Sequence, residues 1–233
     1  MPFLELIKIN KSFGEGDSMV HVLKDIDLEV DQGKFCVLLG PSGSGKSTLL
    51  NIIGGIDTAD SGEIRVRGDS LSGMKDKVLT DYRRRHLGYV FQMYNLIPNL
   101  TVRENIEVGA YISDHPLNVD ELIATLGLAE HRNKLPNQLS GGQQQRASIG
   151  RAIVKNPDIL LCDEPTGALD YSTSKEILAL IERVCQKYGS TVVMVTHNSA
   201  IQEMADIVVR LRDGMVRDRF ENKYKKRAEE LEW

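Results

Sequence analysis

Nine residues near the start of the chain have the types and spacing of a phosphate-binding loop. They are Gly40, Pro41, Ser42, Gly43, Ser44, Gly45, Lys46, Ser47 and Thr48, and they fit the pattern G-x-x-x-x-G-K-[ST]. The glycines allow backbone conformations that a Cβ would forbid, so successive N–H groups can converge on phosphate oxygens. We expect Lys46 to neutralise the outer phosphates and the hydroxyl of Ser47 to ligate Mg²⁺. The spacing therefore predicts a site for a nucleoside triphosphate.

Two carboxylates, Asp163 and Glu164, follow the apolar run 159–162. A strand this apolar is buried, so charges at its tip are tolerated only at the carboxyl edge of a sheet, where open α/β sheets bind ligands. We expect Asp163 to hold Mg²⁺ beside the γ-phosphate. Neighbouring strand residues alternate faces, so we expect Glu164 to have a separate role, which is to orient and polarise the attacking water. The alternative is a pair of surface acids that cap a strand.

His197 lies just past a second apolar run, 191–195. A lone histidine is more often structural than catalytic. At the carboxyl end of a parallel strand, however, a contact to the γ-phosphate is geometrically reasonable. Position alone leaves both interpretations open.

A second anion site is predicted at the run Leu139–Arg146. Ser140 can cap a helix that starts near Gln143, and Gly141 and Gly142 expose backbone N–H groups at the positive end of that helix. A simple helix cap would explain the serine but not the whole run of bare backbone. Two phosphate-binding surfaces in one chain suggest that the second serves the nucleotide of another molecule.

The elements that must position these residues follow from the hydrophobic pattern. Apolar runs flank the phosphate loop at 35–39 and 48–53, as a strand before it and a helix after it. Alternation at 3–9 and 20–30 predicts antiparallel strands with one solvated face. A further set of segments is expected downstream: a short strand at 62–68, mostly helix at about 70–156, parallel strands at 159–162 and 191–195, and a helix at 172–186.

Composition narrows the class of protein. The net charge of −4 gives no argument for binding nucleic acid through bulk charge. The three cysteines are far apart, without C-x-x-C spacing, and are expected to be buried, reduced thiols. Neither an apolar run long enough for a membrane helix nor a signal peptide is predicted. The charged run 217–233 is expected to be a solvated helix or a frayed end.

These motifs together resemble the ATP-binding cassette (ABC) ATPases over essentially the whole chain. The specific mark is L-S-G-G-Q followed about twenty residues later by the Asp-Glu strand. The resemblance implies further sites. Gln92 matches the Q-loop glutamine that contacts Mg²⁺ and senses the γ-phosphate, Asp170 the D-loop that crosses the dimer interface, and His197 the switch histidine. Phe13 falls where the family places an aromatic ring against adenine, and phenylalanine keeps the stacking face. The implied ATP contacts also include Ser140, Gly141, Gly142 and Gln143.

The resemblance also implies a fold. It is α/β, a P-loop NTPase with a RecA-like parallel core sheet, an N-terminal antiparallel β subdomain and an inserted α-helical subdomain. The expected division of this single cassette is 1–92 and 157–220 for the ATP-binding core, 93–156 for the helical subdomain and 221–233 for a charged tail.

Within the superfamily, the likeness is to the group of lipoprotein-release, macrolide- and peptide-export and cell-division ATPases. The residues that show this likeness include Gly88–Gln92 and Asn95–Asn105. The resemblance implies a head-to-tail dimer that sandwiches two Mg-ATP, coupled to a separate transmembrane permease on the inner face of the cell membrane. Exposed apolar residues such as Tyr94, Leu96 and Ile97 are candidates for a groove that accepts a permease helix, or alternatively pack the helical subdomain's own core.

Two other functions compete with this one. A non-transport cassette that acts on ribosomes or DNA would be helped by a basic stripe, and the run Arg83–His86 is the one basic cluster before the tail. A solvated helix face explains that cluster equally well, and nucleic acid is not expected as a partner. A non-hydrolysing regulatory cassette is disfavoured because Glu164 and His197 are both present.

Overall fold

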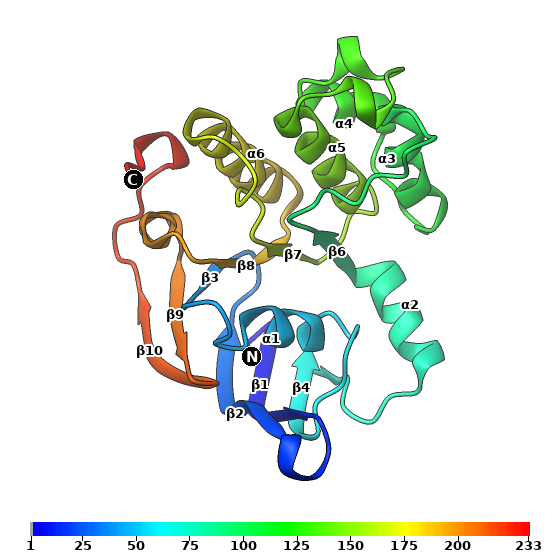
Figure 1. Ribbon diagram of the computed structural model, residues 1–233. Helices are drawn as coiled ribbons and strands as arrows, with labels where there is room; N and C mark the ends of the chain where they lie inside the picture. Colours follow the sequence, from blue (N-terminus) through cyan, green and yellow to red (C-terminus); the bar gives the residue numbers. More distant parts are fainter. Residues whose placement is uncertain (1) are drawn as a thin grey trace.

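The computed structural model describes residues 2–233, and it contains two sheets. The antiparallel sheet has the strand order β2-β1-β4-β5, and the larger sheet has the order β10-β9-β3-β8-β7-β6 (Figure 1). The strands are β1 Leu4–Phe13, β2 Val20–Val30, β3 Phe35–Leu39, β4 Ser61–Val66, β5 Asp69–Ser70, β6 Leu87–Val90, β7 Ile159–Asp163, β8 Thr191–Thr196, β9 Ile207–Arg212 and β10 Met215–Glu221. The helices are α1 Lys46–Ile53, α2 Asp76–His86, α3 Val102–Tyr111, α4 Val119–Thr125, α5 Gly141–Ile153 and α6 Tyr171–Tyr188. Short 3₁₀ turns are η1 Gly16–Ser18, η2 Ala129–His131, η3 Pro136–Gln138, η4 Ser199–Met204 and η5 Ala228–Glu230.

The antiparallel sheet follows from the alternation at the start of the chain. In β1 the side chains of Leu4, Leu6 and Ile9 are buried, and residues between them are partly solvated. Leu4 pairs with Val30 of β2, an antiparallel register that keeps the apolar side chains on one face. The two predicted strands are confirmed.

The larger sheet carries the ends of several strands to one edge. Strands β3, β6, β7 and β8 run parallel, β9 is parallel to β3, and β10 is antiparallel to β9. All residues of β3 and of β8 are buried, since one hydrophobic cluster covers each face of the sheet. The carboxyl ends of β3, β7 and β8 therefore lie side by side. This confirms the prediction of a buried parallel sheet.

Helices α3, α4 and α5 form a group of their own, away from the antiparallel sheet (Figure 1). Two glycines let the helices approach closely. A Cβ on Gly109 of α3 would lie 2.4 Å from the carbonyl oxygen of Arg151, and one on Gly150 of α5 would lie 2.6 Å from Cδ1 of Leu126. Gly150 is therefore a packing residue, since any side chain there would push the helices apart.

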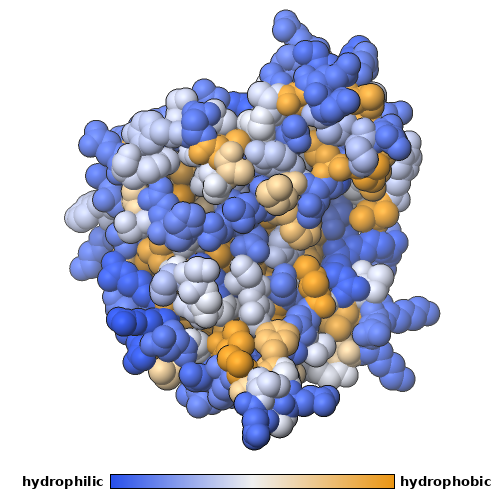
Figure 2. Space-filling model, in the orientation of Figure 1, coloured by the Kyte–Doolittle hydropathy of each residue, from blue (hydrophilic) through white to orange (hydrophobic). Residues whose placement is uncertain are grey.

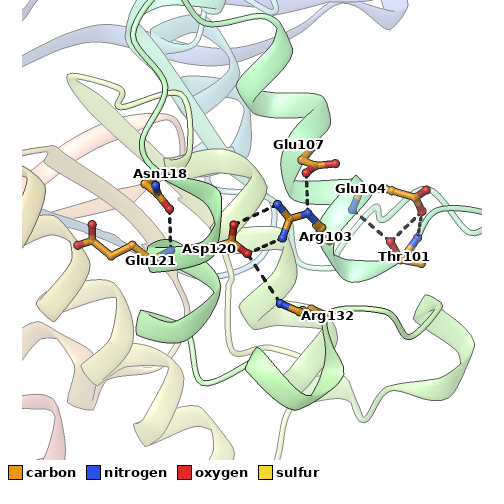
Figure 3. A network of polar contacts seen from close by, with 8 residues as sticks. All are labelled: Thr101, Arg103, Glu104, Glu107, Asn118, Asp120, Glu121 and Arg132. Atoms are coloured by element: carbon orange, nitrogen blue, oxygen red, sulfur yellow. Dashed lines mark hydrogen bonds and ion pairs between the residues drawn. The ribbon is translucent and has the colours of Figure 1, made fainter.

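Polar contacts reinforce this helical group at the ends of its helices (Figure 3). Arg103 of α3 contacts Glu107 on its own helix and Asp120 at the start of α4, and Asp120 also faces Arg132 at 4.0 Å. Thr101 and Glu104 form a reciprocal capping box at the start of α3. The network joins α3 to the first turn of α4.

The C-terminal run is not a solvated helix or a frayed end, so that prediction is wrong. Residues up to Glu221 belong to β10, and the segment 222–233 then folds back over α6. Ala228 and Leu231 are fully buried, and Trp233 packs edge-on against Tyr171 with ring centroids 4.8 Å apart. The run contains few apolar residues among many charged ones, so its composition did not predict that these few would be packed against α6.

All three cysteines, Cys36, Cys162 and Cys185, are free and buried, as predicted. Among residues 2–233, no helix is long and apolar enough to cross a membrane.

Candidate nucleotide site

The phosphate loop connects β3 to α1 at the carboxyl edge of the larger sheet. Gly43 and Gly45 have φ of 78° and 94°, a region that side-chain-bearing residues rarely adopt. A Cβ on Gly45 would lie 2.7 Å from Cδ2 of Leu23, and one on Gly40 would lie 2.3 Å from the carbonyl oxygen of Leu211. The loop is thus held between β2 and β9, and only glycine fits at these two contacts.

Lys46 lies inside this loop with 5% of its surface exposed. Its Nζ donates to the carbonyl oxygens of Gly40 and Pro41, each at 2.8 Å. Burial lowers the pKa of Lys46, while the charges of Glu164 and Asp163 oppose the shift. The hydroxyl of Ser44 is buried and has no hydrogen-bond partner among residues 2–233. A buried ammonium and an unpaired hydroxyl in one loop fit an anion such as a phosphate group.

Oxygen donors suited to Mg²⁺ meet beside the loop. The hydroxyl of Ser47 donates to Oδ1 of Asp163 at 3.1 Å, and Asp163 closes β7. Burial raises the pKa of Asp163, and the hydrogen bond from Ser47 opposes this. No group of three His, Cys, Asp or Glu side chains gathers as a metal site within residues 2–233. Mg²⁺ commonly uses one or two protein oxygens together with substrate phosphates, so this pair fits it.

Glu164 and His197 face each other across the ends of β7 and β8. Oε2 of Glu164 lies 2.7 Å from Nδ1 of His197. Glu164 has a φ of 45°, and its N–H donates to the carbonyl oxygen of Val195 at 3.0 Å. A glutamate with positive φ is strained, and such strain recurs at functional sites. The turn directs Glu164 to His197, whereas its neighbour Asp163 contacts Ser47.

Gly167 lies between Gln92 and Glu164. The sequence patterns did not predict a role for this glycine. A Cβ there would lie 2.9 Å from Nε2 of Gln92 and 3.3 Å from Oε2 of Glu164. Gln92 and Glu164 are therefore neighbours of the same bare backbone position. The signal available in the sequence was a glycine three residues after the acid.

The predicted second anion site is a capped helix end, and α5 begins at Gly141 rather than near Gln143. The Ser140 hydroxyl accepts from the N–H of Gln143 at 3.3 Å, and Gln143 Oε1 accepts from the N–H of Ser140 at 3.0 Å. Gly142 is also a packing position, since a Cβ there would lie 2.5 Å from Cγ2 of Thr173. At the positive end of α5, Gly141 is half-buried and Gly142 is buried, and the side chain of Gln143 is engaged in the cap, so an anion site here stays a prediction.

Asp170, the D-loop match, is the N-cap residue of α6. It accepts from the N–H of Thr173 at 3.0 Å and from the hydroxyls of Ser172 and Thr173, each at 2.7 Å. These hydrogen bonds, that of the Thr173 N–H first, lower the pKa of Asp170 strongly.

The predicted site residues fall into two groups, one at the edge of the larger sheet and one at the start of α5. The first group consists of the phosphate loop, Asp163, Glu164, His197 and Gln92. The second group is the run 139–143. Beside the first group is a cleft of about 800 Å³ lined in part by Gly40, Pro41 and His197. No hydrogen bond within residues 2–233 links the phosphate loop to residues 139–143.

Phe13 ends β1, and its side chain is 46% exposed. It pairs with Val20 of β2, two residues before Val22, whose carbonyl oxygen would lie 3.0 Å from a Cβ on Gly45. Nζ of Lys11 lies 5.1 Å from the centroid of its ring. The half-exposed ring is therefore on the strand pair that supports the phosphate loop.

Comparison with known proteins decides the family. Residues 23–167 match the family model described as ABC transporter. The chain belongs to the ABC transporter family. The chain is 46% identical over 99% of its length to a putative ABC transporter ATP-binding protein of Mycoplasma pneumoniae. It is 42% identical over 93% of its length to a macrolide export ATP-binding/permease protein of Neisseria gonorrhoeae.

Solved structures agree with this assignment. A dimeric, post-hydrolysis ATP-binding cassette bound to ADP and phosphate is 37% identical, with a TM-score of 0.85 over 94% of this chain and 98% of that one. The ABC cassette fold and the ABC ATPase activity predicted from the sequence are thereby confirmed. This cassette spans 50% of the Mycoplasma relative and 34% of the Neisseria relative.

Proposed function

We propose that two copies of this cassette sandwich two Mg-ATP, each held between the phosphate loop of one copy and the signature run 139–143 of the other. The observation that carries the proposal is the separation of the two anion-binding surfaces within one chain. Phosphate-loop residues and acids gather at one sheet edge, while the helix end at Gly141 and Gly142 has no hydrogen bond to them within residues 2–233. The dimeric ADP-bound relative supports this arrangement.

We propose the following catalytic roles, which the family resemblance and the contacts of these side chains support. Lys46 clamps phosphate charge from inside the loop. Ser47, Asp163 and Gln92 would hold Mg²⁺, and the ion would supply charge neutralisation at the phosphates. Glu164 orients and polarises the attacking water. His197 braces the γ-phosphate, and its Nδ1 contact holds the Glu164 carboxylate in place. Ser140 can accept from Gln143 and still direct its own proton to the γ-phosphate of the other copy's ATP.

We further propose that ATP-driven closure powers a membrane permease for export, lipoprotein or peptide extrusion, or mechanotransmission. The Neisseria relative, whose printed name joins ATP-binding and permease functions, supports this. The cassette would then lie on the cytoplasmic face of the membrane. Whether the permease is a separate polypeptide, and where the three expected subdomain boundaries fall, stay predictions.

A groove beside the α3 helix is where we place the permease contact. It encloses about 290 Å³. Its wall includes Ile56 and Ile112, which are 51% and 45% exposed, and the stacked rings of Tyr89 and Phe91. Apolar side chains gather between the α3–α5 group and α2, on the right of Figure 2. An amphipathic cytoplasmic helix of the permease fits such a groove.

The predicted groove residues are only partly exposed. Leu96 packs against the core, Tyr94 is half-buried, and Ile97 is 39% exposed. The basic cluster Arg83–His86 is largely paired within the chain: Arg84 and Arg85 each contact Asp81 and Asp114, and His86 contacts Asp158. No observation here favours a ribosome- or DNA-directed function.

Size-exclusion chromatography of Glu164→Gln, with and without Mg-ATP, tests the sandwich. This variant should bind Mg-ATP, stall hydrolysis and elute as a dimer only when Mg-ATP is present. Glu29→Gln is the matched control, because Glu29 is exposed on β2, and it should hydrolyse ATP normally. Wild-type hydrolysis by Glu164→Gln would refute the role of Glu164, and a monomer with Mg-ATP would refute a sandwich held by nucleotide alone.

The permease contact has its own test. Ile112→Asp should leave ATP hydrolysis by the isolated cassette unchanged and abolish co-purification with the permease. Val78→Asp, at a position that is 46% exposed on α2, is the control and should retain the permease. Retention of the permease by Ile112→Asp would overturn this placement of the contact.

A further inference from the structure

Gln145 is a fully buried polar residue on the signature helix α5, and none of the roles assigned above uses it. Its exposed fraction is 0%. It lies five residues after Ser140, one turn into the helix whose N-terminus is proposed to meet ATP of the other copy. A buried amide needs partners for its donors and its acceptor.

The amide group of Gln145 connects α5 to the two loops that carry catalytic residues. Its Nε2 donates to the carbonyl oxygen of Pro165 at 2.7 Å and lies 3.5 Å from the carbonyl oxygen of Phe91. Pro165 directly follows Glu164, and Phe91 directly precedes Gln92. One side chain therefore touches the backbone beside both the water-orienting glutamate and the Q-loop glutamine.

The orientation of this amide is set by what it faces. Two carbonyl oxygens attract an NH₂ group and repel an amide oxygen, so the reversed orientation is excluded. Oε1 of Gln145 is consequently left buried and has no hydrogen-bond partner among residues 2–233. A buried acceptor without a donor is uncommon in native proteins and calls for an explanation.

We infer that Gln145 is a positioning residue that couples engagement of the signature helix to the placement of Glu164 and Gln92. This role rests on the proposed function, because it requires that α5 meets the nucleotide of a second copy. A shift of α5 when its N-terminus meets the γ-phosphate is passed through the Gln145 amide to Pro165 and Phe91. Hydrolysis in one site is then tied to closure of the other.

Gln145→Met tests this role, since methionine keeps the side-chain length and removes the donor. Gln145→Leu is a second variant with a different shape. Gln144→Met is the matched control, because Gln144 is the next residue on the same helix and its Nε2 reaches only the carbonyl oxygen of Leu139, at 3.3 Å. We would measure kcat and KM for Mg-ATP, and dimer formation by each variant in the Glu164→Gln background.

The expected result is a lower kcat with little change in KM or in dimer formation. Both Gln145 variants should lower kcat at least about 10-fold, keep KM within about twofold of wild type, and still form the Mg-ATP dimer when combined with Glu164→Gln. Gln144→Met should leave all three quantities within about twofold.

Two results would overturn the role of Gln145 alone. One is a Gln145→Met enzyme with wild-type kcat. The other is a parallel loss of kcat, nucleotide affinity and dimer in both variants, which would make Gln145 a residue of the core only. A Glu164→Gln protein that stays monomeric with Mg-ATP would instead overturn the proposed function, and this role with it.

Discussion

Oε2 of Glu164 lies 2.7 Å from Nδ1 of His197, although 33 positions of sequence separate the two residues. Each follows a different strand of the parallel sheet, and β7 and β8 are adjacent in that sheet. The contact requires that a proton lies on Nδ1 when Glu164 is ionised. Nε2 then donates to a phosphate oxygen, which can only accept, when it carries a second proton. The sheet register thus brings two catalytic candidates into one unit.

His197→Ala should lower kcat for ATP hydrolysis by at least about 10²-fold, because it removes a positioned group at the reacting phosphate and frees the Glu164 carboxylate. The affinity for Mg-ATP should change little. Steady-state kinetics with an equilibrium nucleotide titration separate the two effects. His21→Ala, at an exposed position on β2, is the control. Equal loss of affinity and kcat would contradict this assignment.

Lys46→Ala should weaken nucleotide binding about 10- to 100-fold, since hydrogen bonds to charged groups contribute roughly 1.5–3 kcal/mol. In the structure its ammonium already lies inside the loop, held by the carbonyl oxygens of Gly40 and Pro41. A fluorescent nucleotide titration measures the change. Lys24→Ala on β2 should bind normally, and unchanged affinity in Lys46→Ala would rule out the charge clamp.

Native protein should not react with a thiol reagent such as DTNB. Burial raises the pKa of Cys36 and of Cys185 to about 12, and that of Cys162 rises as well, so little thiolate exists at pH 8. Three thiols per chain should react after unfolding in guanidinium. Fast labelling of any cysteine in the folded protein would contradict the burial described here.

Leu231→Ala should lower the free energy of unfolding by about 2–5 kcal/mol, because the side chain is fully buried beside α6. Glu232→Ala, its exposed neighbour, should change the free energy of unfolding by less than about 0.5 kcal/mol. Urea denaturation monitored by circular dichroism measures both variants. Equal free energies of unfolding for the two variants would contradict the packing of segment 222–233 against α6.

The stability contribution of Asp170 should depend on pH. Its folded-state pKa is lowered by the hydrogen bonds that cap α6, so the ionised side chain stabilises the folded state above its ordinary pKa of about 4. This contribution is lost as the pH falls through the lowered folded-state value. The stability difference between wild type and Asp170→Asn should therefore be larger at pH 6 than at pH 3 in urea denaturation. A difference that stays constant would contradict the cap.

Three features could be predicted from the sequence because each depends on residues that are close together in the chain. They are the phosphate loop, the acidic strand end and the capped signature helix. Near neighbours in the chain decide the positive φ of Gly43 and Gly45 and the apolar–polar alternation of β1 and β2. They also decide the capping pattern of Ser140 and Gln143. The parallel sheet followed from apolar runs at 159–162 and 191–195. Their burial on both faces leaves ligand-binding polar residues only at the strand ends.

Tertiary structure alone decided how distant residues meet. Gln145 contacts Pro165 and Phe91 only because α5 packs across both loops, and Leu231 is buried only because α6 covers it. The partial burial of Leu96 and the exposure of Ile112 likewise depend on which elements pack beside them. The amino-acid sequence determined which chemistry this cassette can perform, since side-chain types and local spacing set it. Long-range packing decided which residues position that chemistry, because those contacts join segments with no local pattern in common.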